Sequence, residues 1–199
     1  MLTALAAKIK ESGLRAAVLT KHAIGGIFGF YMAYNALYNT NMNDDDKILH
    51  LNSIIKEIEE TDLPDVLLME APDAVMKYTD GFPNGSGIHS YILTQAVVPD
   101  YFICCLPYDL AINEFIEDLS RGFVIRFGVP IGAVHVSNLT IDNNDSVQYN
   151  RLTYSYIAHI RVLQQINVNA KGNNGCIPAY DVINGGIDDL FDHLLNSGK

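Results

Sequence analysis

The stretch Pro64-Asp65-Val66-Leu67-Leu68-Met69-Glu70 decides the fold class of this 199-residue chain. Apolar residues follow one another without a polar residue between them, and a carboxylate closes the run. Continuous rather than alternating hydrophobicity predicts a strand buried on both faces, as the strands of parallel sheets are. The first expectation is therefore a parallel sheet that is covered by helices.

The same pattern, an apolar strand followed by an amphipathic helix, occurs again further along the chain. Strands are predicted at 101–106 and 131–136. Between them, apolar residues at helical spacing predict a helix that carries Ile112, Phe115, Ile116, Leu119 and Phe123. Strands that alternate with helices of this length indicate right-handed βαβ units. The predicted fold class is α/β, with three layers and a mostly parallel sheet.

Some of the remaining segments have a clear pattern of helix or strand, and others do not. Helical spacing predicts a first helix whose apolar face is Leu2, Leu5, Ala6 and Ile9. It also predicts a helix over 46–60 with the core stripe Ile48, Leu51, Ile55 and Ile58, and a closing helix with Ile187, Leu190, Phe191 and Leu194. A short strand is predicted at 14–20, a polar loop at 141–147, and a strand followed by a short helix over 151–165. The glycine-rich, aromatic stretch 25–31 receives no assignment.

Bulk composition limits the functional classes. A chain of 199 residues normally forms one domain with a full α/β core, so a single domain over 1–199 is expected. The net charge of −10 argues against a broad nucleic-acid surface, which needs clustered Lys and Arg. No apolar run approaches the roughly 18 residues of a membrane span. Three cysteines, two of them adjacent, make a poor disulfide framework, and they predict a cytoplasmic protein.

The strand ends supply the candidate site residues. Ligands of open α/β sheets bind outside the carboxyl ends of the strands, a rule that selects the segments 20–22, 70–73, 106–109 and 137–138, with Glu70 as the sharpest candidate. A carboxylate at that place is suited to hold Mg²⁺, directly or through water, and the alternative is a solvated or hydrogen-bonded acid without a ligand. Lys21 follows the strand at 14–20 and could contact a phosphate; its alternative is a surface charge.

Several common catalytic motifs do not occur in the chain. No G-x-x-x-x-G-K-[ST] sequence is present, although such a loop supplies the amides and the lysine that cradle phosphates. No pair of histidines has the spacing of a zinc site, and no G-x-S-x-G elbow indicates a serine hydrolase. The sequence therefore leaves enzymatic activity open.

Taken in order, the first helix and the segments 65–72, 98–109 and 129–142 resemble the SIMIBI branch of P-loop proteins, such as dethiobiotin synthetase and the MinD-like ATPases. In those proteins the segment similar to 65–70 is the Walker B strand, whose acid serves the magnesium ion. The segment similar to 128–138 ends in an asparagine that reads the nucleotide base. The resemblance implies a P-loop NTPase-like fold that lacks the first strand and the Walker A loop. It also implies a metal near Glu70, nucleotide contacts from Lys21 and Asn138, and Mg²⁺ with ATP or GTP as cofactors.

Short pieces of the chain also resemble a bacterial peptide maturation system family. These pieces are Phe28-Gly29-Phe30, Leu51-Asn52 and Pro64-Asp65-Val66 with the downstream Pro72. Members of that family accompany radical-SAM enzymes that modify ribosomally made peptides, and they are longer and begin with a P-loop. The glycine-rich turn that they carry after the proline reads Asp73-Ala74-Val75 in this chain. The expectation is a domain truncated at its N-terminus, with impaired nucleotide hydrolysis.

A missing first strand would leave backbone groups in the middle of the sheet without partners, which is costly when they are buried. Four arrangements would supply the missing partners. The remaining strands could close up, a partner could donate a strand, the chain could be part of a longer protein, or two copies could pair their exposed edges in a homodimer.

Two functions follow from these observations. The first is an accessory protein of ribosomal peptide maturation that is ancestrally nucleotide-binding. If catalysis survives there, it is a Mg²⁺-dependent hydrolase or synthetase-like activity with Glu70 holding the ion. The second is a non-catalytic module that presents a surface to a precursor peptide or to a peptide-modifying enzyme, and that uses the aromatic stretch from Phe28 to Tyr34.

Overall fold

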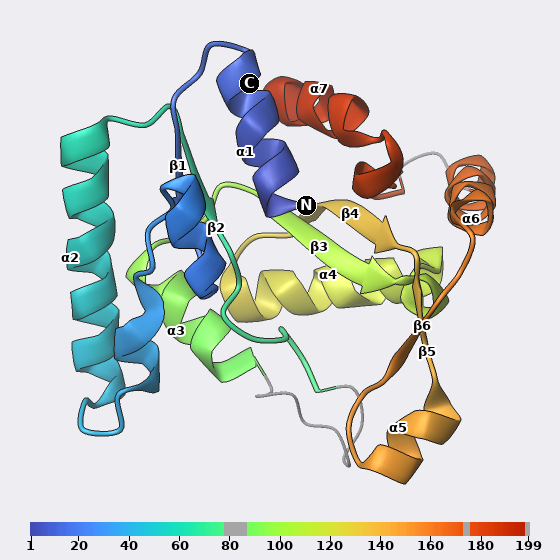
Figure 1. Cartoon of the computed structure of the whole chain (residues 1–199), viewed down its shortest axis with the longest axis horizontal. Coiled ribbons are helices and arrows are strands. Elements are labelled where there is room, and N and C mark those ends of the chain that lie inside the picture. The colour runs from blue at the N-terminus through green and yellow to red at the C-terminus, as the bar shows by residue number, and fades with distance from the viewer. Residues whose placement is uncertain (78–86, 173–175, 198–199) are drawn as a thin grey trace. The chain divides into compact units, whose positions relative to one another are not determined.

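The structure is a computed structural model that describes residues 1–77, 87–172 and 176–197 (Figure 1). Its contacts divide the chain into two compact units, one of residues 2–98 and one of residues 99–199 together with Met1. Both units combine helices with parallel strands, so the predicted α/β class is confirmed. The expectation that 1–199 forms a single domain stays a prediction.

The N-terminal unit contains a two-stranded parallel sheet. Its helices and strands are α1 (Leu2–Glu11), β1 (Ala16–Leu19), the 3₁₀ helices η1 (Ala23–Phe28) and η2 (Tyr34–Tyr38), α2 (Asp44–Asp62), β2 (Val66–Met69) and α3 (Ile88–Ala96). β1 pairs with β2 in a register that places Ala16 opposite Val66 and Leu19 opposite Met69. The chain after β1 and the chain after β2 therefore leave the sheet at the same edge.

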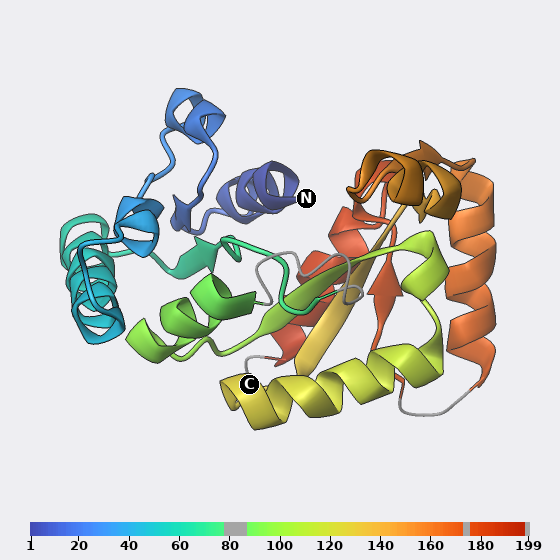
Figure 2. The ribbon, with the colours of Figure 1, turned by 90° about the horizontal axis from the view of Figure 1, so that it is seen from below.

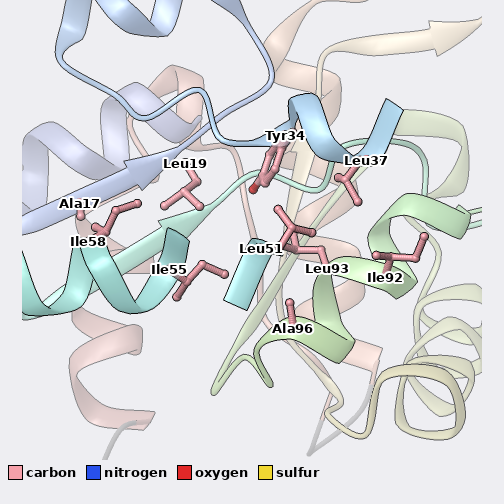
Figure 3. Packing of buried hydrophobic residues seen from close by; sticks show 10 residues of the cluster. All are labelled: Ala17, Leu19, Tyr34, Leu37, Leu51, Ile55, Ile58, Ile92, Leu93 and Ala96. Atoms are coloured by element: carbon pink, nitrogen blue, oxygen red, sulfur yellow. The ribbon is translucent and has the colours of Figure 1, made fainter. Parts of the chain in front are cut away.

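The core of this unit lies between the sheet and α2, α3 and η2 (Figure 3). Its buried members are Ala17, Leu19, Tyr34, Leu37, Leu51, Ile55, Ile58, Ile92, Leu93 and Ala96. Because side chains alternate along a strand, Val18 points to the opposite face of β1, and α1 contacts the sheet. Leu5, Ala6 and Ile9 of α1 are buried, which confirms the predicted face of that helix.

Local signals explain where α2 begins and ends. The side chain of Asn43 accepts a hydrogen bond from the Asp46 amide at 2.8 Å, as an N-cap residue should. Three aspartates occupy the first turn, where the helix dipole favours negative charge. Leu63 then adopts a left-handed conformation (φ 45°) and ends the helix.

The C-terminal unit is built around a three-stranded parallel sheet with the order β3-β4-β7. Its helices and strands are β3 (Phe102–Pro107), η4 (Tyr108–Leu110), α4 (Asn113–Phe127), β4 (Ile131–Ser137), β5 (Leu139–Ile141), α5 (Asn143–Tyr149), β6 (Tyr154–Tyr156), α6 (His159–Gly172), β7 (Ala179–Tyr180), η5 (Val182–Asn184) and α7 (Ile187–Ser197). Figures 1 and 2 show α4 and α7 on opposite sides of this sheet. Within this unit, helices therefore cover the sheet on both faces.

The register of this sheet brings the ends of β3 and β4 together. Phe102 pairs with Ile131, the register shifts by one residue after Phe102, and Pro107 pairs with Ser137. β7 adds only two pairs, one of which joins His135 to Tyr180. His135 is buried, and its Nδ1 lies 3.2 Å from the Tyr180 carbonyl oxygen, so the core histidine has a polar partner.

The structure differs from the sequence predictions in several elements. The residues of β2 are half-buried rather than buried on both faces, because β2 belongs to a sheet of only two strands. The polar stretch predicted as a loop contains α5, whose first turn is capped by Asp142 through the Asp145 amide at 3.0 Å. The strand and helix predicted over 151–165 occur as β6 and α6, but the antiparallel pairing of β6 with β5 was not predicted. β7 was not predicted either, since a strand of two residues carries no periodicity.

Candidate functional site

The candidate site lies in the N-terminal unit, at the edge where the chain leaves β1 and β2. Leu19 and Met69 are the last paired residues, so Thr20 and Glu70 follow them side by side. The backbone continues this pairing by one bond, from the Glu70 amide to the Leu19 carbonyl oxygen at 3.0 Å. Parallel pairing thus places the Thr20-Lys21-His22 sequence beside Glu70.

Glu70 is held by three neighbours from the end of β1. The hydroxyl of Thr20 donates a short hydrogen bond to Oε2, and the backbone amide of Lys21 donates to the same oxygen at 3.3 Å. Nε2 of His22 lies 3.0 Å from Oε1. A carboxylate offers about four lone-pair positions, so Oε1 retains one for a further ligand. The Glu70 side chain is 24% exposed, so solvent reaches part of it.

Lys21 brings a positive charge to the same end of the sheet as Glu70. Its Nζ donates to the carbonyl oxygen of Pro72 at 3.0 Å, and the hydroxyl of Tyr38 donates to the same oxygen at 3.3 Å. An ammonium group has three donors, so Lys21 can hold Pro72 and still contact an anion. The structure therefore brings Lys21 and Glu70 together, as their places after adjacent strands predicted.

Thr20 is the residue that fixes Glu70, and its own position depends on η1. Thr20 is 3% exposed, and it accepts a hydrogen bond from the His22 amide at 3.2 Å. Its methyl group faces Gly25, where the Cβ of any other residue would stand only 2.4 Å from Thr20 Cγ2. The absence of a side chain at Gly25 thus allows η1 to pack against Thr20.

Tyr34 is a buried residue of the same unit, and its hydroxyl group is unpaired among the described residues. It is 2% exposed, and its hydroxyl has no hydrogen-bond partner among the described residues. Burial raises the pKa of Tyr34 above the ordinary value of tyrosine, and the nearby carboxylate of Glu70 raises it further. The hydroxyl therefore stays protonated at neutral pH.

Asp73 connects the turn after β2 to the N-terminus of α3. Its carboxylate accepts hydrogen bonds from the backbone amides of His89 at 3.3 Å and of Ser90 at 3.2 Å, and from the Ser90 hydroxyl at 2.6 Å. Nδ1 of His89 lies 3.3 Å from the same carboxylate, and the His89 ring packs against Tyr38 at a tilt of 59°, with centroids 4.9 Å apart. Asp73 thus takes the position that an anion occupies at other helix N-termini.

Asn138, the third residue predicted to contact nucleotide, belongs to the C-terminal unit. It follows β4 directly, and its carbonyl oxygen accepts a hydrogen bond from the Ile157 amide at 2.9 Å. Asp109, which follows the end of β3, accepts bonds from the Thr140 hydroxyl at 2.6 Å and the Ile141 amide at 2.7 Å. Asn138 thus stands at the carboxyl end of a parallel strand, as expected, and its contact with a base stays a prediction.

The donor set at Glu70 suits some metals better than others. Within residues 1–77, 87–172 and 176–197, no three His, Cys, Asp or Glu side chains gather as metal ligands. A zinc site needs such a set, whereas Mg²⁺ is commonly held by one or two carboxylates with waters and phosphate oxygens. One carboxylate with a spare lone pair, within electrostatic reach of an unpaired buried hydroxyl, fits Mg²⁺. In the same described residues, no helix has the length and apolar character needed to cross a membrane.

Sequence reasoning placed the segments 20–22 and 70–73 at strand ends, and it singled out Glu70 and Lys21 among them. Glu70 and Lys21 follow predicted strands, which is a signal that can be read locally. The contributions of Thr20 and His22 depend on the parallel register, although both are neighbours of Lys21. The sequence placed Tyr34 in an aromatic surface stretch, but the residue is buried, because η2 packs on the core.

Comparisons with known proteins bear on the fold alone. No protein-family model and no curated protein matches the sequence. Among solved structures, the chain is similar to a DUF1611 family protein from Anabaena variabilis ATCC 29413, with a TM-score of 0.62 and 14% sequence identity. The match covers 98% of this chain and 53% of that one, so the chain spans about half the length of its structural relative. At this identity the likeness supports an α/β fold with parallel strands.

Proposed function

We propose that this chain is a cytoplasmic accessory protein of ribosomal peptide maturation that binds Mg²⁺ together with a nucleotide at the Glu70 edge. The observation that carries the proposal is the arrangement of Glu70 and Lys21 at the carboxyl ends of two parallel strands. Ligands of α/β proteins bind at such edges. The P-loop-like assignment and the maturation context rest on the sequence resemblances, and they belong to the proposal.

The residues at this edge have separate roles in the proposed site. Glu70 would hold the cation through Oε1, where the exposed His22 is the contact that a cation would replace. Lys21 would meet the negative charge of a phosphate with the donors that Pro72 does not use. A bound Mg²⁺ would neutralise part of the phosphate charge. The proposal is one of binding, and it assigns no nucleophile or general base.

The test is a thermal shift of the purified chain with Mg²⁺ plus ATP or GTP, measured against Mg²⁺ alone. A ligand at 100 times its dissociation constant stabilises the folded state by about 2.7 kcal/mol, which is a readily visible rise in melting temperature. Glu70→Gln should abolish the rise, because the amide lacks the negative charge that attracts the cation. Glu60→Gln is the matched control, since Glu60 is an exposed residue of α2. A nucleotide response that survives in Glu70→Gln would place the ligand elsewhere.

A second function is favoured by the surface of η1 and the residues after it. Ile24, Ile27, Phe28 and Met32 are all more than half exposed, and Ile27 reaches 82%. No Asp, Glu, Lys or Arg occurs between Lys21 and Asp44, although the chain carries a net charge of −10. Exposed apolar groups that gather in one segment are typical of binding surfaces.

For this second function we propose that the segment presents an apolar surface to a precursor peptide. Binding of such a peptide without nucleotide, lost in Ile27→Asp and retained in Glu70→Gln, would favour it over the first. Binding that persists in Ile27→Asp would exclude this surface.

A further inference from the structure

The hydroxyl group of Tyr34 is buried and has no hydrogen-bond partner among the described residues. The ring of Tyr34 packs in the core of the N-terminal unit with Leu37, Leu51 and their neighbours (Figure 3). A phenylalanine would fill nearly the same volume without burying a polar atom. Buried polar groups in folded proteins almost always have a partner, so an unpaired hydroxyl calls for one.

The surroundings of this hydroxyl show where its partner belongs. Figure 3 shows the oxygen of Tyr34 directed toward the end of β2, which Glu70 follows. The Glu70 carboxylate is close enough to contribute to the raised pKa of Tyr34. The two oxygens of Glu70 are bonded by Thr20, Lys21 and His22, and no bond joins them to Tyr34. An unpaired hydroxyl therefore lies within electrostatic reach of a carboxylate that retains one lone pair.

We propose that the Tyr34 hydroxyl is the inner contact of the Glu70 site, where it hydrogen-bonds an oxygen atom in the coordination shell of a bound divalent cation. This inference rests on the proposed function, and it gives Tyr34 an inner role in place of the surface role that the sequence suggested, since Tyr34 is buried. The oxygen can come from water or from a phosphate group.

The chemistry of a tyrosine hydroxyl suits both sources. It has one donor and two acceptor lone pairs, so it can accept a bond from a cation-bound water or donate one to a phosphate oxygen. Mg²⁺ keeps several of its waters when it binds to proteins, and these waters need partners. Because the ring is fixed in the core, the hydroxyl is already in place before the ligand arrives. Such preorganisation lowers the entropic cost of binding.

The test compares Tyr34→Phe with wild type in two titrations, one with Mg²⁺ alone and one with Mg²⁺ and ATP. Without ligand, the variant should melt at the same or a higher temperature, because removing an unpaired buried hydroxyl costs nothing. With ligand, its dissociation constant should rise about 2- to 12-fold, the equivalent of one hydrogen bond. A loss with Mg²⁺ alone identifies water as the partner, and a loss only with ATP identifies a phosphate oxygen.

Tyr31→Phe is the matched control, since the hydroxyl of Tyr31 donates to Asp62 at 2.7 Å and belongs to the same unit. That variant should leave both dissociation constants unchanged. If Glu70→Gln abolishes binding and Tyr34→Phe binds as wild type does, the inference is overturned and the proposed function stands. If wild type responds neither to Mg²⁺ nor to Mg²⁺ with ATP, both are overturned. A lower melting temperature of the ligand-free Tyr34→Phe variant would show that the hydroxyl already has a partner, and it would also overturn the inference.

Discussion

A methyl group added at Gly25 should disturb the Glu70 edge through Thr20. The Cβ of an alanine at this position would stand 2.4 Å from Thr20 Cγ2 and 3.3 Å from Phe30 Cβ. Carbon atoms pack best at about 3.5–4.0 Å, so η1 or Thr20 has to move by roughly 1 Å. Thr20 is buried and β-branched, and rotating it would break its hydrogen bond to Glu70.

We expect Gly25→Ala to lower the free energy of unfolding by about 1–3 kcal/mol, the usual cost of overpacking a core. The assay is urea denaturation followed by circular dichroism. Gly26→Ala is the matched control, because its Cβ would meet only Met32 Cε at 4.0 Å. Both variants restrict the unfolded chain equally, so the difference between them isolates the clash.

Thr20→Ser separates this mechanism from other effects of the alanine. Serine keeps the hydroxyl that holds Glu70 and removes the methyl group that the new Cβ would strike. Gly25→Ala should therefore cost at least about 1 kcal/mol less in the Thr20→Ser background than in wild type, a coupling typical of residues in contact. An equal cost in both backgrounds, or no cost relative to Gly26→Ala, would refute the reasoning.

Three further predictions concern Asp73, Asp65 and His135. Asp73→Ala removes the carboxylate that caps α3 and should cost about 1–2 kcal/mol in urea denaturation, and a change within error would mean that the cap contributes nothing. Hydrogen bonds from Arg15 lower the pKa of Asp65, so the folded state binds fewer protons than the unfolded state. The stabilisation that results is present above about pH 3.9, and it is lost as the pH falls through the pKa of Asp65 in the folded state. The urea midpoint of Asp65→Asn should accordingly fall less steeply than that of wild type below about pH 4, and parallel curves would disprove it. Burial lowers the pKa of His135, so its contribution to folding stability is present above about pH 6.5 and declines as the pH falls below that value. In His135→Gln, the urea midpoint should therefore vary less with pH between about pH 7 and 5. An unchanged slope would contradict the assignment.

Elements with a long or continuous apolar pattern could be predicted from the sequence. α1, α2 and α4 each carry several turns of periodic apolar residues, and the parallel strands β1 to β4 are short apolar runs that end in polar residues. α5 could not be predicted, because its seven residues are mostly polar and its start depends on a cap by Asp142. η1 received no assignment, because two of its six residues are glycines and Gly25 packs closely against Thr20, a contact that the sequence does not reveal.

The candidate site, too, could be predicted only in part. Glu70 and Lys21 could be named because the end of a buried strand is visible in the sequence. The bond from Thr20, the ion pair with His22 and the unpaired hydroxyl of Tyr34 are properties of the folded unit. They arise from strand register and core packing, which one sequence does not reveal.

The most direct test of the central claim is to locate the bound cation itself. Mn²⁺ takes the oxygen ligands that Mg²⁺ takes, and its unpaired electrons broaden the nuclear magnetic resonance signals of nearby amides. We predict that Mn²⁺ with ATP broadens the amide signals of residues 20–22 and 70–72 before others, and that Glu70→Gln removes this selectivity. Uniform broadening, or broadening centred on another segment and unchanged in Glu70→Gln, would contradict a cation site at Glu70.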